Sequence, residues 1–377
     1  MIEAGSFLAA ARSRGFELIS GVPCSYLTPF INRVIDDDAV RYVAAANEGD
    51  AVAIAAGSEL GGVPAIAMFQ NSGLGNAVSP LTSLTHVFKL PVLLIVTLRG
   101  EPGGPPDEPQ HSLMGAITLE ILQSMKIPWE YFPDDEDQVE AVLDKALAAM
   151  KETQRPFALA MRKGTVKPSP IRTRLQQKDV GAQTCTNKEA THRRRDMLLA
   201  IQQASLAPDI VIATTGYTGR ELFACEDREN QLYMVGSMGC APSLGLGLAL
   251  CRPERNVTVI DGDGAAMMRM GSMTTIGYER PTNLVHILLD NHVHESTGAQ
   301  STVSRSIDFC AIAAACGYPA VYRVNDPQEL TDLLKRKDPQ LKFIHVPILP
   351  GIPENLGRPA STPAEVASRL RKFMDRK

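Results

Sequence analysis

Short apolar runs rich in β-branched residues alternate with helix-like stretches along most of this chain of 377 residues. The expected strands are residues 16–19, 42–45, 64–69, 91–98, 157–161, 209–213, 232–235, 257–260, 284–289, 320–324 and 341–348. Runs of this length, separated by helical patterns, are typical of parallel sheets with helices on both faces. The alternation therefore predicts an α/β fold built from mostly parallel sheets.

The alternation is interrupted between Gly164 and Arg195, where the apolar period is lost and the sequence becomes polar and basic. A chain of this length is expected to form two or more domains. We therefore predict a first domain at residues 1–165, a linker at 166–190 and a second domain at 191–377. The run HRRRD at 192–196 is expected to begin a helix with its arginines on a solvated face, and a nucleic-acid patch is the alternative.

Charge and cysteine content limit the class of protein. A formal net charge of −4 gives no electrostatic footprint for nucleic acid or an anionic membrane, and the apolar stretch LPVLLIVTL at 90–98 is too short to span a bilayer. The seven cysteines include no C-x-x-C pair, which argues against a disulfide framework and fits a reducing cytoplasm. The first 15 residues are expected to form an amphipathic helix, not a signal peptide. We expect a cytoplasmic protein with neither nucleic-acid nor membrane partners.

The stretch VIDGDGAAM at 259–267 places a carboxylate between two glycines at the end of an expected strand. Gly262 and Gly264 let the backbone turn sharply and approach a ligand closely. Residues 265–278 are expected to form one helix, whose N-terminal N–H groups would favour a phosphate. Because the Asp263 carboxylate would repel a phosphate, a cation is expected between them.

Asn291 follows the next expected strand, so its side chain and that of Asp263 should face one cavity from neighbouring strand ends. Side-chain oxygens of Asp and Asn, together with a backbone carbonyl and phosphate oxygens, suit the octahedral shell of Mg²⁺. The alternative is two unrelated surface loops.

Two other ligands are alternatives. Three glycine-rich stretches, GDGAAM, GLGLAL at 245–250 and GLGNAV at 73–78, are near misses of the dinucleotide fingerprint. They leave open a dinucleotide-binding dehydrogenase or a regulator. His292 and His294 have the H-x-H spacing of a zinc site, but no third ligand is evident.

The G-D-G stretch followed at this distance by D-N resembles the signature of the thiamine diphosphate enzymes. The resemblance implies two thiamine diphosphate-binding-type α/β domains, with the first of pyrimidine-binding type and the second of diphosphate-binding type. It also implies thiamine diphosphate and Mg²⁺ as cofactors. The metal would be held by Asp263, Asn291 and the carbonyl of Val293, and Gly264 and Ala265 would contact the cofactor.

The same resemblance implies an activating glutamate at a helix start in the first domain, and RYVAAANEGD at 41–50 supplies Glu48. A carboxyl at this place must share a proton with the aminopyrimidine ring. The alternatives are a plain interaction of Glu48 with the helix dipole and the same catalytic role for Asp50.

Two stretches of the second domain resemble the remaining cofactor contacts of this family. In MVGSMGCAP at 234–242, Gly236 would accept a hydrogen bond from the pyrimidine amino group and Met238 would hold the two rings apart. In TTGYTGREL at 214–222, Thr215, Gly216 and Tyr217 would receive the diphosphate. A methionine more often fills a hydrophobic core, which is the alternative for Met238.

Two stretches of the first domain, GVPCSYL at 21–27 and QNSGLGN at 70–76, resemble loops of the 2-oxo acid decarboxylases of this family. Two others, DEPQHSLMG at 107–115 and DNHVHESTGAQ at 290–300, together most resemble the phosphonopyruvate decarboxylases. Ser25, Gln110 and His111 would contact the substrate, and His111 would relay protons unless it is only a surface-loop histidine. The paired histidines of pyruvate decarboxylases are replaced here by Gln110 and His111.

The implied reaction is decarboxylation of 3-phosphonopyruvate to phosphonoacetaldehyde and carbon dioxide, as in phosphonate biosynthesis. Sulfopyruvate or another small 2-oxo acid is the alternative substrate, since tetrahedral oxyanions of similar size are hard to distinguish by sequence. Arg99, Arg162, Lys163 and Arg220 are candidate partners for the anion. The resemblance further implies a homodimer or larger homo-oligomer with active sites at the subunit interface.

Overall fold

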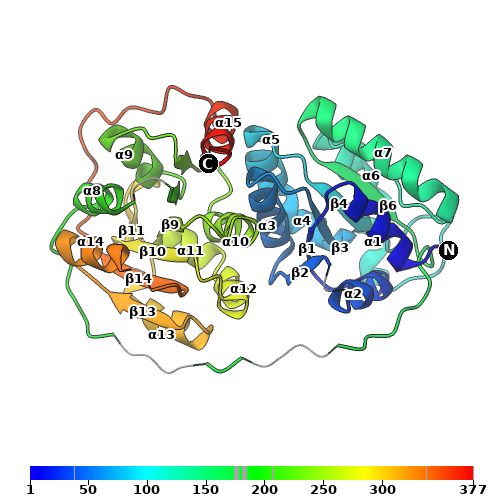
Figure 1. The fold of residues 1–377 in the computed structure, drawn as a ribbon, viewed down its shortest axis with the longest axis horizontal. Coiled ribbons are helices and arrows are strands. Elements are labelled where there is room, and N and C mark those ends of the chain that lie inside the picture. Colours follow the sequence, from blue (N-terminus) through cyan, green and yellow to red (C-terminus); the bar gives the residue numbers. More distant parts are fainter. Residues whose placement is uncertain (38, 174–177, 181–184, 206–207, 337, 377) are drawn as a thin grey trace. The chain divides into compact units, whose positions relative to one another are not determined.

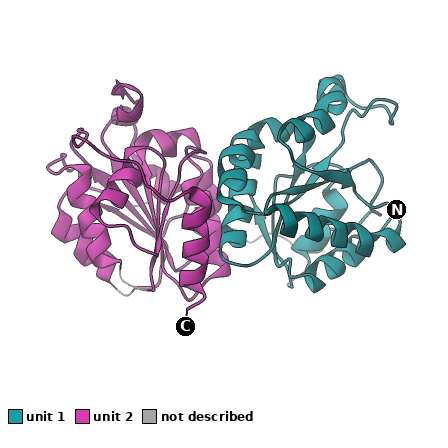
Figure 2. Ribbon diagram, turned by 90° about the horizontal axis from the view of Figure 1, so that it is seen from above, with its two compact units in different colours: residues 1–177 teal, residues 178–377 magenta. Residues whose placement is uncertain are grey.

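Two separate parallel sheets carry the strands predicted by the alternating pattern (Figure 1). The structure is a computed structural model that describes residues 1–377 apart from 38, 174–177, 181–184, 206–207, 337 and 377. It divides into unit 1, Met1–Gln177, and unit 2, Lys178–Lys377 (Figure 2). The boundaries of the predicted linker remain a prediction, and part of it, 174–177 and 181–184, lies outside the described residues.

Unit 1 contains a six-stranded parallel sheet in the order β2-β1-β3-β4-β6-β5. Its strands are β1 Leu18–Gly21, β2 Arg41–Ala44, β3 Ala65–Gln70, β4 Leu93–Thr97, β5 Trp129–Tyr131 and β6 Phe157–Met161. Gly21 pairs with both Ala44 and Met68, so β1 and β2 end at one level and β3 continues two residues further, to Gln70. The loops after these strands therefore meet at one edge of the sheet.

Helices cover both faces of this sheet (Figure 1). They are α1 Ala4–Ser13, α2 Thr28–Ile35, α3 Glu48–Leu60, α4 Leu74–Pro80, α5 His86–Phe88, α6 Ser112–Ser124 and α7 Glu136–Thr153. On one face, α1, α2 and α7 bury a cluster around Phe7, Phe30 and Phe132, whose rings lie 4.8–6.0 Å apart. Helix α3, which is rich in alanine, is buried along nearly its whole length.

Unit 2 contains a second six-stranded parallel sheet, in the order β13-β14-β10-β9-β7-β8. Its strands are β7 Ile210–Ala213, β8 Gln231–Tyr233, β9 Val257–Gly262, β10 Leu284–Asp290, β13 Ala320–Arg323 and β14 Lys342–Pro347. Its helices are α8 Arg194–Ala204, α9 Tyr217–Cys225, α10 Ala241–Cys251, α11 Asp263–Met268, α12 Ser272–Glu279, α13 Phe309–Ala315, α14 Pro327–Lys335 and α15 Pro363–Met374. Both units are thus α/β, as predicted.

The structure differs from the predicted elements in a few places. Strands β3 and β4 begin after Pro64 and Pro91, because proline has no N–H to donate to a ladder. The expected helix 265–278 is wrong: α11 and α12 are separate, because the backbone leaves the helical conformation at Arg269. The three-residue strand β5 and the hairpin of β11 Val293–His294 with β12 Gln300–Ser301 were not predicted.

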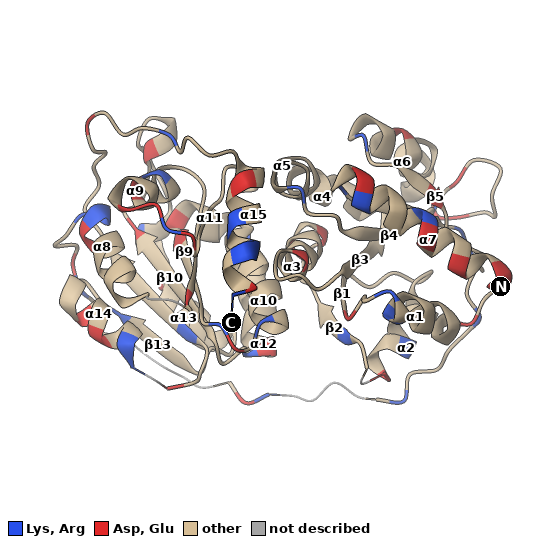
Figure 3. Cartoon of the chain, turned by 45° about the horizontal axis from the view of Figure 1, so that its top comes forward, with Lys and Arg blue, Asp and Glu red and all other residues tan. Residues whose placement is uncertain are grey.

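Charged side chains of both signs are interspersed on surface helices of each unit, such as α7 and α15 (Figure 3). On α7 the first turn carries Glu136 and Asp137 and the last turn carries Lys151, an arrangement that complements the helix dipole. None of the helices in the described ranges is both long enough and apolar enough to cross a membrane.

Candidate active site

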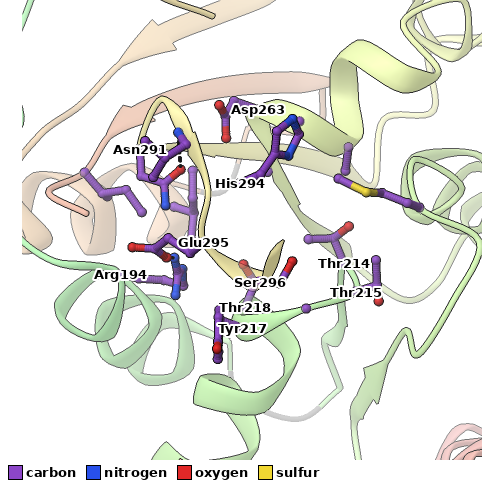
Figure 4. Close-up of a pocket in the computed structure, with 18 residues that line it drawn as sticks. Arg194, Thr214, Thr215, Tyr217, Thr218, Asp263, Asn291, His294, Glu295 and Ser296 are labelled. Atoms are coloured by element: carbon purple, nitrogen blue, oxygen red, sulfur yellow. Dashed lines mark hydrogen bonds and ion pairs between the residues drawn. The ribbon is translucent and has the colours of Figure 1, made fainter. Parts of the chain in front are cut away.

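A cavity opens at the C-terminal edge of the unit 2 sheet (Figure 4). Most of its lining comes from the ends of three neighbouring strands, β7, β9 and β10, and from the loops that follow them, and the rest comes from Arg194, Met238 and Ile348. The lining residues are Arg194, Thr214, Thr215, Gly216, Tyr217, Thr218, Met238, Gly262, Asp263, Gly264, Ala265, Leu289, Asn291, Val293, His294, Glu295, Ser296 and Ile348. This edge is where open α/β sheets bind ligands.

The turn from β7 to α9 forms one wall of the cavity. Gly216 has a φ of +91°, which favours glycine, and a Cβ placed on it would meet its nearest heavy atom only at 3.9 Å, on Ser296. The first N–H groups of α9 have no partner within the helix and carry the positive end of its dipole. Thr215, Gly216 and Tyr217 therefore line an open turn that is suited to an anion.

The end of β9 brings a buried carboxylate into the cavity. Asp263 is 4% exposed, and its Oδ2 accepts a hydrogen bond of 2.6 Å from the Thr302 hydroxyl. Within the described part of the chain this carboxylate pairs with no cationic side chain. Burial raises its pKa, and the neighbouring Asp290 adds to that effect, because both disfavour the charged form. Such a group is stabilised by a bound cation.

The end of β10 lies beside Asp263 because Leu289 pairs with Gly262 in the sheet. Asn291 is 6% exposed, and its Oδ1 accepts a hydrogen bond of 3.2 Å from the Val293 N–H. Both Asn291 and Val293 line the same cavity as Asp263. The predicted set of metal ligands is therefore brought together at two adjacent strand ends.

A polar network that the sequence did not reveal supports these groups. Thr302 donates to Asp263 and lies 2.9 Å from the Ser304 hydroxyl, which donates to Asp290 Oδ1 at 2.9 Å. His345 Nε2 lies 3.1 Å from Asp290 Oδ2. Burial opposes ionisation of Asp290, but the hydrogen bond from His345 and nearby charges lower its pKa overall. The sequence signal that was missed is Thr302 and Ser304, which follow STGAQ at 296–300.

The zinc alternative for His292 and His294 is not favoured. His292 Nδ1 lies 2.7 Å from the Ser304 hydroxyl and 3.0 Å from Asp290 Oδ1, so it belongs to the polar network. No cluster of three or more His, Cys, Asp or Glu residues suited to a metal occurs among the residues that the structure describes. The predicted Mg²⁺ set differs in kind, since it uses one carboxylate, one amide and one backbone carbonyl.

The expectation that all three arginines of HRRRD face solvent is wrong for Arg194. This residue is 5% exposed and pairs with Glu221 at 2.5 Å and with Glu295. Arg194 begins α8, so packing turns its side chain inward, while Arg193 and Arg195 are exposed. Glu295 Oε1 also accepts from the Gly351 N–H at 2.5 Å. The cluster fixes the loop that carries Asn291 and Val293 (Figure 4).

Of the two cofactor residues predicted in MVGSMGCAP, one lines the cavity and the other does not. Met238 lines the cavity, and its Cε lies 3.3 Å from where a Cβ on Gly264 would be. Gly236 is half-buried and is not part of the cavity lining. The neighbouring GLGLAL lies inside α10, and a Cβ on Gly245 would come within 2.3 Å of Val259. Gly245 serves helix–strand packing, and the helical conformation of this stretch removes the basis for a dinucleotide loop there.

In unit 1, Glu48 begins α3 directly after β2, as its sequence context predicts. Its side chain is half-buried, and its Oε2 accepts a hydrogen bond of 2.9 Å from Asn76 Nδ2. A Cβ on Gly73 would lie 2.2 Å from Glu48 Oε1, so glycine is required for this close approach. Asn47 caps the helix by accepting from the Gly49 N–H, so the Glu48 carboxyl does not serve as the cap.

The other predicted residues of unit 1 differ in burial. His111 is 6% exposed, so it is not a surface-loop histidine, and its Nδ1 has no hydrogen-bond partner in the described part of the chain. Gln110 and Ser25 are exposed. A Cβ on Gly100 would lie 2.2 Å from the His111 carbonyl, so the turn after β4 fits closely against this histidine.

The residues of the unit 2 cavity fit a diphosphate held through a divalent cation. The cavity combines a glycine turn with open space at Gly216, a buried carboxylate without a cationic partner at Asp263, and amide and carbonyl oxygens at Asn291 and Val293. Oxygen donors of this kind are those that Mg²⁺ prefers.

Comparison with protein families agrees with this geometry. Residues 3–116 match the N-terminal TPP binding domain of thiamine pyrophosphate enzymes, and residues 215–346 match their C-terminal TPP binding domain. The solved structure of benzoylformate decarboxylase from Polynucleobacter necessarius has the same fold, with a TM-score of 0.70 at 12% identity over 93% of this chain and 99% of that one.

Curated relatives match nearly the whole chain. The phosphonopyruvate decarboxylase of Streptomyces viridochromogenes is 42% identical over 382 residues, 99% of this chain and 95% of that protein. That of Streptomyces hygroscopicus is 44% identical over 384 residues, with 99% and 94% covered. The sulfopyruvate decarboxylase of Methanosarcina acetivorans is more distant, at 28% identity over 379 residues, with 97% and 95% covered. The chain therefore belongs to the thiamine pyrophosphate enzyme family and is similar to its phosphonopyruvate decarboxylases.

Proposed function

We propose that this enzyme decarboxylates 3-phosphonopyruvate to phosphonoacetaldehyde and carbon dioxide, with thiamine diphosphate and Mg²⁺ as cofactors. The observation that carries the proposal is the buried Asp263 carboxylate, which has no cationic partner in the described structure and lies beside the glycine turn at Gly216. Its close homologues are phosphonopyruvate decarboxylases, whereas the sulfopyruvate decarboxylase is more distant. This difference favours the phosphonate over the sulfonate.

In unit 2, the roles follow from the chemistry of each group. Asp263, Asn291 and the Val293 carbonyl would hold Mg²⁺, and the turn at Thr215, Gly216 and Tyr217 would bind the diphosphate through its N–H groups. Gly264 and Ala265 border the same space. Met238 would support the bent cofactor, and the Gly236 carbonyl would accept from its amino group.

Thiamine diphosphate, when bound, supplies a carbanion and an electron sink for the electron pair released with carbon dioxide. Glu48 would hold a proton at its carboxyl and exchange it with the pyrimidine ring, which requires a half-buried carboxyl with few competing partners. His111 would deliver a proton to the reacting carbon, and its free Nδ1 is consistent with a group that waits for a ligand. Ser25 and Gln110 would contact the substrate.

We propose that the active enzyme is a homodimer or larger homo-oligomer, with unit 1 of one copy and unit 2 of another forming each active site. The predicted acid–base residues, Glu48 and His111, belong to unit 1, and the predicted metal ligands belong to unit 2. If each site is shared between two copies, a single copy does not contain a complete active site.

Mixing two inactive variants tests the shared site. Glu48→Gln and Asp263→Ala proteins would be dissociated, combined and reassociated. With random pairing, half of the dimers are mixed and each holds one intact site, so roughly a quarter of all sites recover. If both residues of a site come from one chain, activity stays absent even though subunit exchange is demonstrated with labelled copies.

A cytoplasmic location is also proposed. No disulfide joins any of the seven cysteines, all of which lie in the described ranges, as is usual in a reducing compartment.

The test of the proposed function is a coupled aldehyde assay on phosphonopyruvate, sulfopyruvate and pyruvate with the cofactor-loaded protein. We expect the largest kcat/KM for phosphonopyruvate. A larger kcat/KM for sulfopyruvate, or equal turnover of pyruvate, would contradict the phosphonate assignment while leaving the cofactor in place.

A further inference from the structure

Three cationic side chains lie within two residues of the C-terminal ends of strands of the unit 1 sheet. Arg99 follows β4, and Arg162 and Lys163 follow β6. Glu48 and the loop at Ser25 belong to the same edge, after β2 and β1. A phosphonate-bearing substrate that reacts near Glu48 requires a positively charged group close by, so these three cations are the candidates in unit 1.

Arg99 is held in one orientation by its neighbours. Its Nε and Nη2 donate to the two carboxylate oxygens of Asp107, at 3.0 and 2.5 Å, and its guanidinium lies 5.3 Å from the centre of the Tyr26 ring. The Tyr26 hydroxyl donates to the same carboxylate at 3.0 Å. The Asp107 side chain is 6% exposed, and the hydrogen bonds from Arg99 hold its pKa well below the usual range, so it stays ionised.

This side-on contact leaves Nη1 of Arg99 available. Its nearest acceptor is Gln70 Oε1 at 3.4 Å, a long contact that Gln70 shares with the Cys24 thiol of the GVPCSYL loop. A guanidinium fixed through two nitrogens presents the third without losing further rotational freedom. Nη1 is therefore a directed donor beside the loops after β1 and β3, and the Arg99 side chain remains 19% exposed.

The backbone connects Arg99 to the predicted catalytic groups of unit 1. Asn71 Nδ2 donates to the Arg99 carbonyl at 2.9 Å, and the turn that begins at Asn71 leads to Gly73, which lies against Glu48. On the other side, Gly100 lies against His111. Arg99 is thus connected through short backbone segments to the glycines that lie against Glu48 and His111.

The other basic candidates are less suited to the substrate. Arg162 pairs with Glu101 through three contacts of 2.7–3.0 Å, is 48% exposed and stacks at 3.7 Å on Tyr131 of the edge strand β5. Lys163 is exposed. Arg220, in unit 2, donates to the backbone carbonyls of Leu356 and Gly357. Arg99 differs from Arg162 and Lys163 in its burial, because its side chain is 19% exposed and is held by both oxygens of Asp107.

We propose that Arg99 binds the phosphonate group of the substrate through Nη1 and thereby determines the specificity of the enzyme. The inference rests on the proposed function, because it takes phosphonopyruvate as the substrate. Hydrogen bonds from an arginine to a phosphonate are charge-assisted and directional, so they distinguish this substrate from 2-oxo acids without an anionic tail. The contact does not change during decarboxylation, so it should act on substrate binding more than on turnover.

The test compares Arg99→Gln with Arg162→Gln in the holoenzyme. Loss of a charged hydrogen bond should raise KM for phosphonopyruvate roughly 10- to 100-fold in Arg99→Gln and leave kcat within about threefold. Arg99→Lys, which keeps the charge without the planar fork, should give an intermediate KM. Arg162→Gln, the same change at an exposed cation of the same edge, should leave both constants at wild-type values.

Thermal unfolding and thiamine diphosphate affinity report whether each variant is folded. If Arg99→Gln is unstable because Asp107 is left unpaired, the double variant Arg99→Gln/Asp107→Asn removes both charges and should restore stability but not KM. A wild-type KM in either folded variant would overturn the role of Arg99. Failure of the wild-type holoenzyme to decarboxylate phosphonopyruvate would instead overturn the proposed function, and the Arg99 inference with it.

Discussion

Arg194 and Glu295 form a buried ion pair that joins the start of α8 to the loop carrying Asn291 and Val293. Glu221 of α9 shares the same guanidinium at 2.5 Å. Burial raises the pKa of Glu221, and Glu295 adds to this effect while Arg194 opposes it. One arginine therefore compensates two carboxylates beside the cavity.

We expect Arg194→Met to lower the free energy of unfolding by about 3–5 kcal/mol, because it leaves buried carboxylates without a cation. Denaturant unfolding of the cofactor-free protein measures this change. Arg195→Met is the matched control, since the neighbouring arginine is exposed and should change stability by less than about 0.5 kcal/mol. Equal effects of the two substitutions would show that the buried pair contributes no special stability.

Asp263→Ala is expected to lose metal-dependent retention of thiamine diphosphate. Without the carboxylate the cation would be poorly held, and the affinity in Mg²⁺ should fall by roughly 100-fold or more. Calorimetric titration with and without Mg²⁺ measures this loss. Thr302→Val removes only the hydroxyl that donates to Asp263. In this variant the affinity for thiamine diphosphate in Mg²⁺ should fall by roughly tenfold. Unchanged affinity of Asp263→Ala in Mg²⁺ would contradict the metal assignment.

Glu48→Gln is expected to bind thiamine diphosphate normally, while exchange of the thiazolium proton and turnover fall roughly 100-fold or more, as for a lost acid–base group. Proton exchange followed by NMR separates this step from binding. Asp50→Asn is the comparison, because Asp50 is the other carboxyl in the first turn of α3. If Asp50→Asn loses exchange and Glu48→Gln keeps it, the wrong carboxylate has been chosen.

Tyr42 offers a pH-dependent test of burial. Burial raises the pKa of this phenol to about 12, and its hydroxyl has no hydrogen-bond partner in the part of the chain described. A raised pKa contributes stability below the unfolded value of 10 that is lost as pH rises towards 12. Tyr42→Phe cannot ionise and removes an unsatisfied hydroxyl, so it should gain about 1 kcal/mol at pH 7 and more near pH 11.

Urea unfolding at the two pH values gives the comparison for Tyr42. The control is Tyr278→Phe, at a residue that is 36% exposed, which should change stability at pH 7 by less than about 0.5 kcal/mol. The stability difference between Tyr42→Phe and wild type should grow from pH 7 to pH 11. A difference that shrinks over this range would contradict the prediction.

The sequence predicted the fold well because buried parallel strands are continuous apolar runs. Residues 157–161 were predicted with the bounds that β6 has, whereas β5 was missed because three residues, Trp-Glu-Tyr, are too few to show a period. The break between α11 and α12 spans residues 269–271, and the backbone leaves the helical conformation at Arg269, a residue type that does not predict a helix end.

The candidate site was predictable where chemistry is concentrated in a short stretch. Asp263 and Asn291 follow consecutive strands, so their approach could be expected from the topology alone. Arg194 and Thr302 could not be found this way, because their contacts depend on tertiary packing. Arg194 lies in a run of three arginines, and only the direction in which α8 packs decides that the middle one is buried.

The central claim is that this chain releases carbon dioxide from phosphonopyruvate and keeps the carbon–phosphorus bond intact. Phosphorus NMR of the protein with phosphonopyruvate, thiamine diphosphate and Mg²⁺ follows both points in one sample. We predict that the substrate resonance is replaced by an equal area of phosphonoacetaldehyde, without inorganic phosphate, and that omitting the cofactor stops the conversion. An unchanged substrate resonance with the fully loaded protein, or conversion that does not need thiamine diphosphate, would contradict the claim.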